Sequence, residues 1–121
     1  MTSFNGKFSN SNIVTFNELS SFPNITEINS NNRFNSCTSL TSIDLSNITK
    51  ISGANGYERW NFEDCTNLTS VGDTSNVTYF GQDAFNSCSK LEHVDISSAI
   101  TIGSSAFYCS KITFSTLPTS I

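Results

Sequence analysis

A chain of 121 residues with a net charge of −4 is long enough for one domain with a modest core. The negative charge argues against nucleic acid or an anionic membrane surface as a partner, because both attract clustered Lys and Arg. No apolar run approaches the 18 residues that suggest a membrane span, and the first residues lack the apolar segment of a signal peptide.

The first predicted elements are short. Residues 1–12 are polar apart from Phe4 and Phe8, and we interpret them as an N-terminal cap or arm, with a frayed tail as the alternative. Residues 13–16 have the apolar, β-branched character of a short strand. A Pro-Asn turn at 23–24 then leads into a second short strand at 25–28.

From Phe34 onward the same order of apolar residues recurs. The copies are Phe34, Cys37, Leu40, Ile43, Leu45, Ile48, Ile51; Phe62, Cys65, Leu68, Val71, Val77, Phe80; Phe85, Cys88, Leu91, Val94, Ile96, Ile100, Ile102; and Phe107, Cys109, Ile112, Leu117, Ile121. Successive Cys residues lie 28, 23 and 21 positions apart, so the basic unit is close to 23 residues. A unit this short cannot bury its own apolar face, and it must stack on its neighbours as a solenoid.

Each unit contains three recognisable segments. An alternating pair such as Ile43 and Leu45 predicts a strand with one buried face. After a Ser/Asn turn, the segment at 48–51 is a second apolar piece on the opposite wall. The Phe-x-x-Cys segment is compact and predicts a helical or 3₁₀ turn with the Phe ring inward, so that stacking places Phe on Phe and Cys on Cys.

These residues resemble the leucine-rich repeats of the BspA-like (Treponema-type) family, which read roughly C-x-x-L-x-x-I-x-L-P-x-x-[VI]-T-x-I-G-x-x-A-F. Residues 88–96 match its first part and residues 100–107 its second, with one residue missing between Thr101 and Ile102. Residues 37–51 and 65–85 match as well. In the early copies Arg33 and Asn61 replace the Ala, and Asp73 takes a position that is normally Leu or Ile.

The resemblance implies the fold. We expect a β-rich solenoid over residues 13–121, wound as a right-handed leucine-rich-repeat coil. It would contain about four to five repeats of ~23 residues, with short strands and short helical or 3₁₀ turns.

The resemblance also implies a role. Such repeats are typical of extracellular or cell-surface proteins of bacteria, so we expect a non-enzymatic adhesion or interaction module that binds a protein or glycan surface. The alternative is a structural or accessory virion component of a phage of gut bacteria. A missing signal peptide, the initial Met and an end within a repeat at Ile121 suggest this alternative. A partner subunit or a second copy would then cover the open C-terminal coil.

The four Cys residues predict neither a metal site nor another cofactor. Each unit supplies one Cys, and stacked copies form a line, whereas zinc requires a tetrahedral cluster. We therefore expect free, buried thiols that pack as small hydrophobes. His93 and Asp95 share a strand face, but no nucleophile lies beside them in the pattern, which favours an exposed strand pair over an enzyme.

Two sets of residues are candidates for binding. The first, the sheet-face stripe, combines outward positions of successive strands: Ser42, Asp44, Ser70, Gly72, His93 and Asp95. The second lies in a loop inserted before Phe62: Tyr57, Glu58, Arg59 and Trp60. Insertions in solenoids often carry function, although Trp60 could equally cover the adjacent coil.

Four N-x-T triplets begin at Asn24, Asn47, Asn67 and Asn76. In a eukaryotic secreted chain they would be acceptors for N-glycosylation. Because they recur at the junction of turn and strand, we interpret them as structural.

Overall fold

A computed structural model describes residues 8–29, 33–51, 61–108 and 110–112. The elements are β1 (Thr15–Phe16), the 3₁₀ helix η1 (Asn17–Ser21), β2 (Glu27–Ile28), β3 (Ser42–Ile43), β4 (Lys50–Ile51), β5 (Tyr79–Phe80) and β6 (Thr101–Ile102). The strands are short because turns rich in Ser, Asn, Asp and Gly interrupt the apolar pattern every few residues. Within these ranges no helix is long and apolar enough to cross a membrane.

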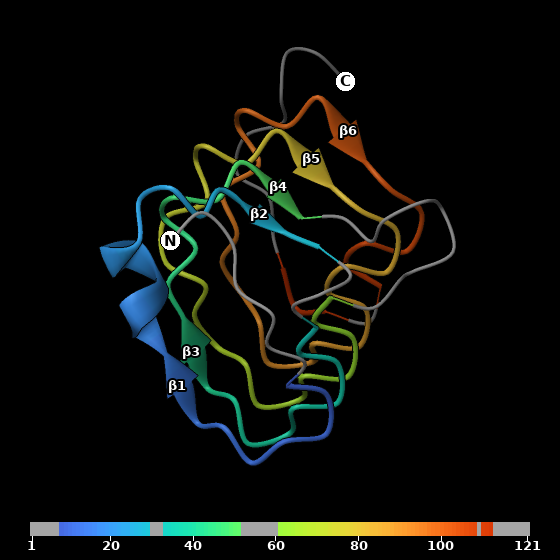
Figure 1. The fold of residues 1–121 in the computed structure, drawn as a ribbon. Coiled ribbons are helices and arrows are strands. Elements are labelled where there is room, and N and C mark those ends of the chain that lie inside the picture. Colours follow the sequence, from blue (N-terminus) through green and yellow to red (C-terminus); the bar gives the residue numbers. More distant parts are fainter. Residues whose placement is uncertain (1–7, 30–32, 52–60, 109, 113–121) are drawn as a thin grey trace.

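The strands form two parallel sheets on different walls of the coil (Figure 1). One sheet pairs β1 with β3, and a bridge joins Ser42 to Ser70 of the next unit. The other runs in the order β2-β4-β5-β6, which aligns Ile28, Ile51, Phe80 and Ile102 in one row. Neighbours in each sheet come from successive units, and this topology confirms the predicted β-rich repeat solenoid.

Phe rings stack on one another through the core. The pairs Phe8–Phe34, Phe34–Phe62, Phe62–Phe85 and Phe85–Phe107 have centroid separations of 5.0, 5.2, 5.0 and 5.7 Å and interplanar angles of 12°, 9°, 4° and 4°. Stacked pairs of this kind contribute about 0.5–1.5 kcal/mol each beyond the burial of their area. The predicted placement of Phe on Phe is confirmed.

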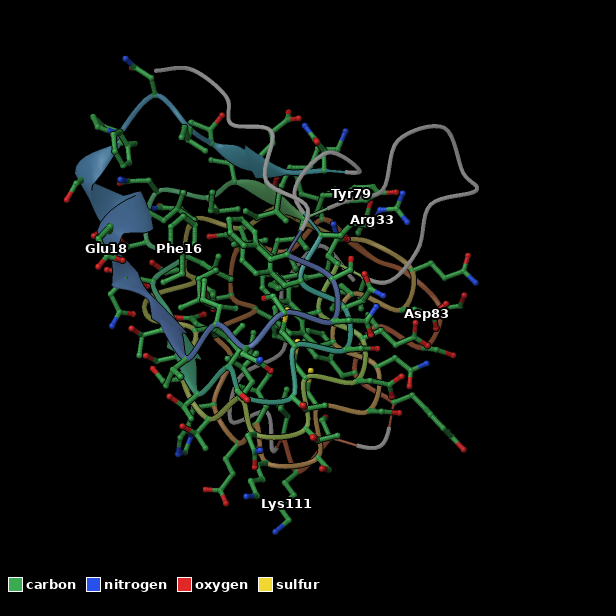
Figure 2. All side chains as sticks on the ribbon, turned by 60° about the horizontal axis from the view of Figure 1, so that its bottom comes forward. Phe16, Glu18, Arg33, Tyr79, Asp83 and Lys111 are labelled. Carbon is green, nitrogen blue, oxygen red and sulfur yellow. The ribbon has the colours of Figure 1, made fainter. Side chains whose placement is uncertain are left out.

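A ladder of thiols runs beside the Phe rings. Cys37, Cys65 and Cys88 are free and buried, as predicted, whereas Cys109 lies outside the described residues. Each thiol donates a hydrogen bond to the carbonyl oxygen of a Phe one unit earlier. The pairs are Cys37–Phe8, Cys65–Phe34 and Cys88–Phe62, with S···O distances of 2.8, 3.0 and 3.1 Å. Figure 2 shows these sulfur atoms inside the coil.

The Phe-x-x-Cys segment is a tight turn rather than a helix. In the three complete copies the Cys N–H donates to the carbonyl of the Phe three residues earlier, at 3.1 to 3.2 Å. The residue before each Cys, namely Ser36, Asp64 or Ser87, has a left-handed φ between 58° and 61°. A helix cannot continue through such a residue, because the left-handed conformation reverses the chain. The 3₁₀ helix of the described chain lies in the first unit, at η1.

The alignment of the fourth unit differs from the predicted one. Register pairs Thr101 with Tyr79 and Ile102 with Phe80, so no residue is missing between Thr101 and Ile102. Ala99 fills the core position and is fully buried, whereas Ile100 is 67% exposed. The prediction that Ile100 packs in the core is therefore wrong, because the small side chain of Ala99 concealed the true apolar position.

The third unit contains one extra residue. Asp73 does not occupy the Leu position but is exposed, and Thr74 is the buried residue there. The insertion is Gly72, whose left-handed φ of 72° lets the chain bulge before Asp73. The predicted alignment of Asp73 with Leu is wrong because the alignment contained no gap at this glycine.

The first unit begins earlier than the strand predicted at residue 13. Phe8 stacks on Phe34, and the Ser11 hydroxyl lies 3.6 Å from the thiol of Cys37. Ser11 thus occupies the Cys position of the first unit. Residues 8–12, predicted as part of a cap or arm, pack directly on the coil of Phe34.

Candidate functional site

The sheet-face stripe begins on the wall formed by β1 and β3. Ser42 pairs with Thr15 on one side and is bridged to Ser70 on the other. The Ser42 hydroxyl also exchanges hydrogen bonds of 3.4 Å with the Asn17 side chain. These contacts bring the first two Ser residues of the stripe together across neighbouring units.

Asp44 and Gly72 of the stripe are in close contact. A Cβ atom placed on Gly72 would lie 2.6 Å from Oδ1 of Asp44 and 3.3 Å from its Cα. Glycine is required here by the positive φ and by this lack of space. Gly72 therefore supplies no side chain for recognition, and the absence of a Cβ leaves room for the Asp44 carboxylate.

The same side-chain turn recurs in three successive units. Oδ1 of Asp44, Asp73 and Asp95 accepts a hydrogen bond from the backbone N–H two residues later, at 3.0, 2.9 and 2.8 Å. Asp73 and Asp95 are exposed, and Asp44 is half-buried. Bonds from Ser75 favour the charged form of Asp73 and hold its pKa below the usual value. We call these three residues the Asp row.

Asp73 was missing from the predicted stripe, yet the sequence contains a signal for it. The pattern D-x-S occurs at residues 44–46, 73–75 and 95–97. Asp followed by Ser two positions later is typical of a turn in which the carboxylate accepts a backbone N–H. Alignment by this pattern, rather than by apolar spacing alone, places Asp73 in the Asp row.

Asp95 is attached to the preceding unit through its backbone. Thr74 Oγ1 donates to the Asp95 carbonyl at 2.9 Å and accepts from the Asp95 N–H at 2.8 Å. The Asp95 carboxylate bonds to the Ser97 N–H, and His93 is exposed two residues earlier. The strand predicted here is wrong, because residues 93–95 do not form a strand. The four residues of the predicted loop, at 57–60, lie outside the described residues.

A second outward row on the other sheet was not predicted. Register aligns Glu27, Lys50, Tyr79 and Thr101, the third residues of the I-T-x-I segments. Lys50 Nζ lies 5.2 Å from the centre of the Tyr79 ring, a cation–π contact. Tyr79 lies on the outer wall in Figure 2. The contact fixes both long side chains, and it occupies one face of the aromatic ring.

The buried thiols are poorly suited to nucleophilic chemistry. Burial raises the pKa of Cys88 to about 12 and raises that of Cys65 further still, with neighbouring thiols adding to the effect on Cys65. A thiolate is the reactive form, so these groups remain protonated near neutral pH. Among the described residues no group of three or more His, Cys, Asp or Glu side chains could hold a metal ion.

Two polar side chains that follow the inserted loop in the sequence are buried or partly buried without full compensation by hydrogen bonds or opposite charge. Asn61 is buried at the position where later units have Ala, and its Oδ1 has no hydrogen-bond partner. Burial raises the pKa of Glu63, and the nearby carboxylates of Asp64 and Asp83 raise it further. These are local departures from the repeat, and they do not converge on a reactive group.

Parallel sheets built from successive units, with Phe and Cys ladders between them, define a leucine-rich repeat solenoid. The chain belongs to the BspA-type leucine-rich repeat family, because the model of the BspA type leucine-rich repeat region (6 copies) matches residues 3–56 and 56–121. The family resemblance predicted from the Cys, Leu and Ile spacing is confirmed.

One solved structure gives a further comparison. The chain is similar to a leucine-rich repeat protein from Eubacterium ventriosum ATCC 27560, with 26% sequence identity and a TM-score of 0.49. The match covers 80% of this chain and 33% of that protein, so this chain spans about a third of its length. A search of curated proteins found no match. Neither matching description names a binding target or a virion.

Proposed function

We propose that the chain is a non-enzymatic interaction module that binds a protein surface, or a glycan surface, outside the cell. Membership of the BspA-type leucine-rich repeat family supports an interaction or adhesion role. The sheet-face stripe, extended by Asp73, is the proposed contact surface. The observation that carries this assignment is the Asp row, in which three successive units present the same fixed carboxylate.

Fixed side chains favour binding because their entropy is already lost. In the Asp row, one carboxylate oxygen of each residue accepts a hydrogen bond from a backbone N–H, which holds the carboxylate in one orientation. Immobilising a flexible side chain on binding costs about 0.5–1.5 kcal/mol, and the existing turn reduces this cost. A rigid row can therefore contribute useful affinity although each contact is small.

The charge of the surface favours one class of partner. The Asp row adds three carboxylates, and exposed Glu92 lies close to it in the sequence. Two cations lie nearby: Lys90 donates to Asn67 at 2.7 Å, and the backbone N–H of exposed Lys111 donates to the Leu91 carbonyl at 3.2 Å. Complementary charge raises association rates and excludes partners of like charge. A protein surface with exposed Lys and Arg therefore suits the stripe better than a sulfated or phosphorylated glycan.

A binding screen tests this proposal. The purified chain is measured against a glycan array and against a panel of purified proteins ranging from acidic to basic, at low and at physiological salt. We expect saturable binding to basic proteins that weakens as salt rises. Binding confined to anionic glycans would overturn the charge assignment, and no binding to any protein or glycan would overturn the interaction role.

A further inference from the structure

The four N-x-T triplets are nearly identical in sequence but not in structure. In three of them the Asn side chain donates to a backbone carbonyl of the preceding unit. The pairs are Asn47–Ser20, Asn67–Thr38 and Asn76–Ser46, at 2.9, 2.6 and 3.4 Å. These amide groups are therefore part of the stacking between units.

The Thr residues of the same three triplets behave alike. Each hydroxyl donates to a carbonyl of the preceding unit, in the pairs Thr49–Thr26, Thr69–Thr41 and Thr78–Thr49, at 3.2, 3.1 and 3.2 Å. Both polar groups of each internal triplet are thus bonded to the coil before it. Modification of an internal Asn would require its bond to the preceding unit to break.

Asn24 and Thr26 lie between η1 and β2. Both residues are exposed, and neither side chain makes a hydrogen bond anywhere in the described part of the chain. Asn24 lies in a turn between η1 and β2, on the surface of the solenoid. Of the four triplets, this one presents both its amide and its hydroxyl to solvent.

We propose that Asn24 is an acceptor site for an N-linked glycan, and that the internal triplets are protected by the fold. The donor is a lipid-linked oligosaccharide diphosphate, brought by an oligosaccharyltransferase. The Asn24 amide nitrogen forms a bond to the anomeric carbon of the sugar, and the bond from that carbon to the diphosphate oxygen breaks. The amide proton passes to a base, and the lipid diphosphate leaves. Recognition of the acceptor requires the Thr hydroxyl two residues later, which Thr26 supplies.

The proposal is tested on the intact folded chain. The chain is incubated with a purified single-subunit oligosaccharyltransferase and a lipid-linked oligosaccharide, and modified sites are mapped by mass spectrometry of peptides. A urea-unfolded sample, diluted into the same reaction, shows which triplets the enzyme accepts without the fold. We expect one glycan, on Asn24, in the folded chain, and additional modification at Asn47, Asn67 and Asn76 in the unfolded sample.

Two variants serve as controls. Asn24→Gln removes the acceptor amide, and Thr26→Val removes the hydroxyl that the transferase recognises. Both changes lie on the surface, and circular dichroism of each variant confirms its folding before the reaction. Either variant is expected to leave the folded chain unmodified. A folded chain without glycan on Asn24, or one modified equally at the internal triplets, would overturn the proposal.

Discussion

Thr74 and Asp95 are joined by two hydrogen bonds that share one hydroxyl group, with the Thr74 Oγ1 bonded to both the carbonyl and the N–H of Asp95. Thr74 fills a position where neighbouring units place Leu45 and Ile96, and it is fully buried. A buried hydroxyl without a partner destabilises a core, so the two bonds explain how a polar residue is tolerated there. The two bonds also hold the Asp95 backbone at a fixed distance from the preceding unit.

Replacing Thr74 should therefore separate shape from hydrogen bonding. Thr74→Val keeps the volume but removes both bonds to Asp95, and we expect it to lower the free energy of unfolding by about 1–3 kcal/mol. Thr74→Ser keeps the hydroxyl and is the matched control, with a smaller loss from the missing methyl group. Urea denaturation measures both. Equal stability of Thr74→Val and the parent chain would show that the two bonds contribute nothing.

Substitution of Gly72 tests whether the bulge that places Asp73 on the surface requires a glycine. Gly72→Ala places a Cβ against Oδ1 of Asp44 and strains a positive φ, so we expect a loss of about 1–3 kcal/mol in the free energy of unfolding. In an Asp44→Ala background the contact with Oδ1 disappears, and the same substitution should cost less. If the cost is identical in both backgrounds, the crowding by Asp44 is not the cause.

The sequence predicts the inward positions well because their spacing is enforced by stacking. A Phe, Cys or Leu that leaves its row opens a cavity in two neighbouring units, so these positions recur with little change. Ser11 escaped prediction because a hydroxyl replaces the thiol of the Cys position in the first unit. Ala99 was not predicted as a core residue because its side chain is small, and the larger Ile100 beside it was assigned to the core instead.

The outward positions could be predicted only in part. Residues of the stripe such as Ser42 and Ser70 follow from strand alternation, and the structure places these two side by side. Asp73 could not be placed from apolar spacing, because Gly72 shifts the frame by one residue. The row containing Lys50 and Tyr79 depends on which units are neighbours in the sheet, and apolar periodicity does not rank exposed residues.

The Phe stack predicts coupling between neighbouring units only. Phe34 and Phe62 are in ring contact, whereas Phe62 lies between Phe34 and Phe85. A double-mutant cycle with Leu at Phe34 and Phe62 should give a coupling energy of about 0.5–1.5 kcal/mol. The same cycle for Phe34 and Phe85 is the control and should be additive within about 0.5 kcal/mol. Equal coupling in both cycles would contradict a nearest-neighbour solenoid.

The buried thiols predict a loss of stability in alkali. The pKa of Cys88 is raised from 9.0 to about 12 by burial, so the folded state holds its proton where the unfolded state releases it. This contribution is complete below pH 9 and is lost as the pH rises toward 12, by up to about 1.4 kcal/mol per pH unit. Cys88→Ala should have lower stability at pH 7 but a shallower decline between pH 9 and 10.5. Parallel declines, measured by urea midpoints, would rule out Cys88 as a source.

The central claim is that a partner binds at the Asp row, whereas the stacked Phe and Cys residues only stabilise the solenoid. The most direct measurement compares Asp73→Asn/Asp95→Asn with Glu27→Gln/Asp64→Asn, which removes two exposed charges elsewhere on the described surface. Asn retains the oxygen that accepts the backbone N–H, so the turns should persist in the first variant. Affinity for the strongest binder of the protein panel is measured by calorimetry at fixed salt. We predict at least a tenfold loss for the Asp-row variant, little change for the control, and equal unfolding midpoints, whereas equal affinities would contradict the account.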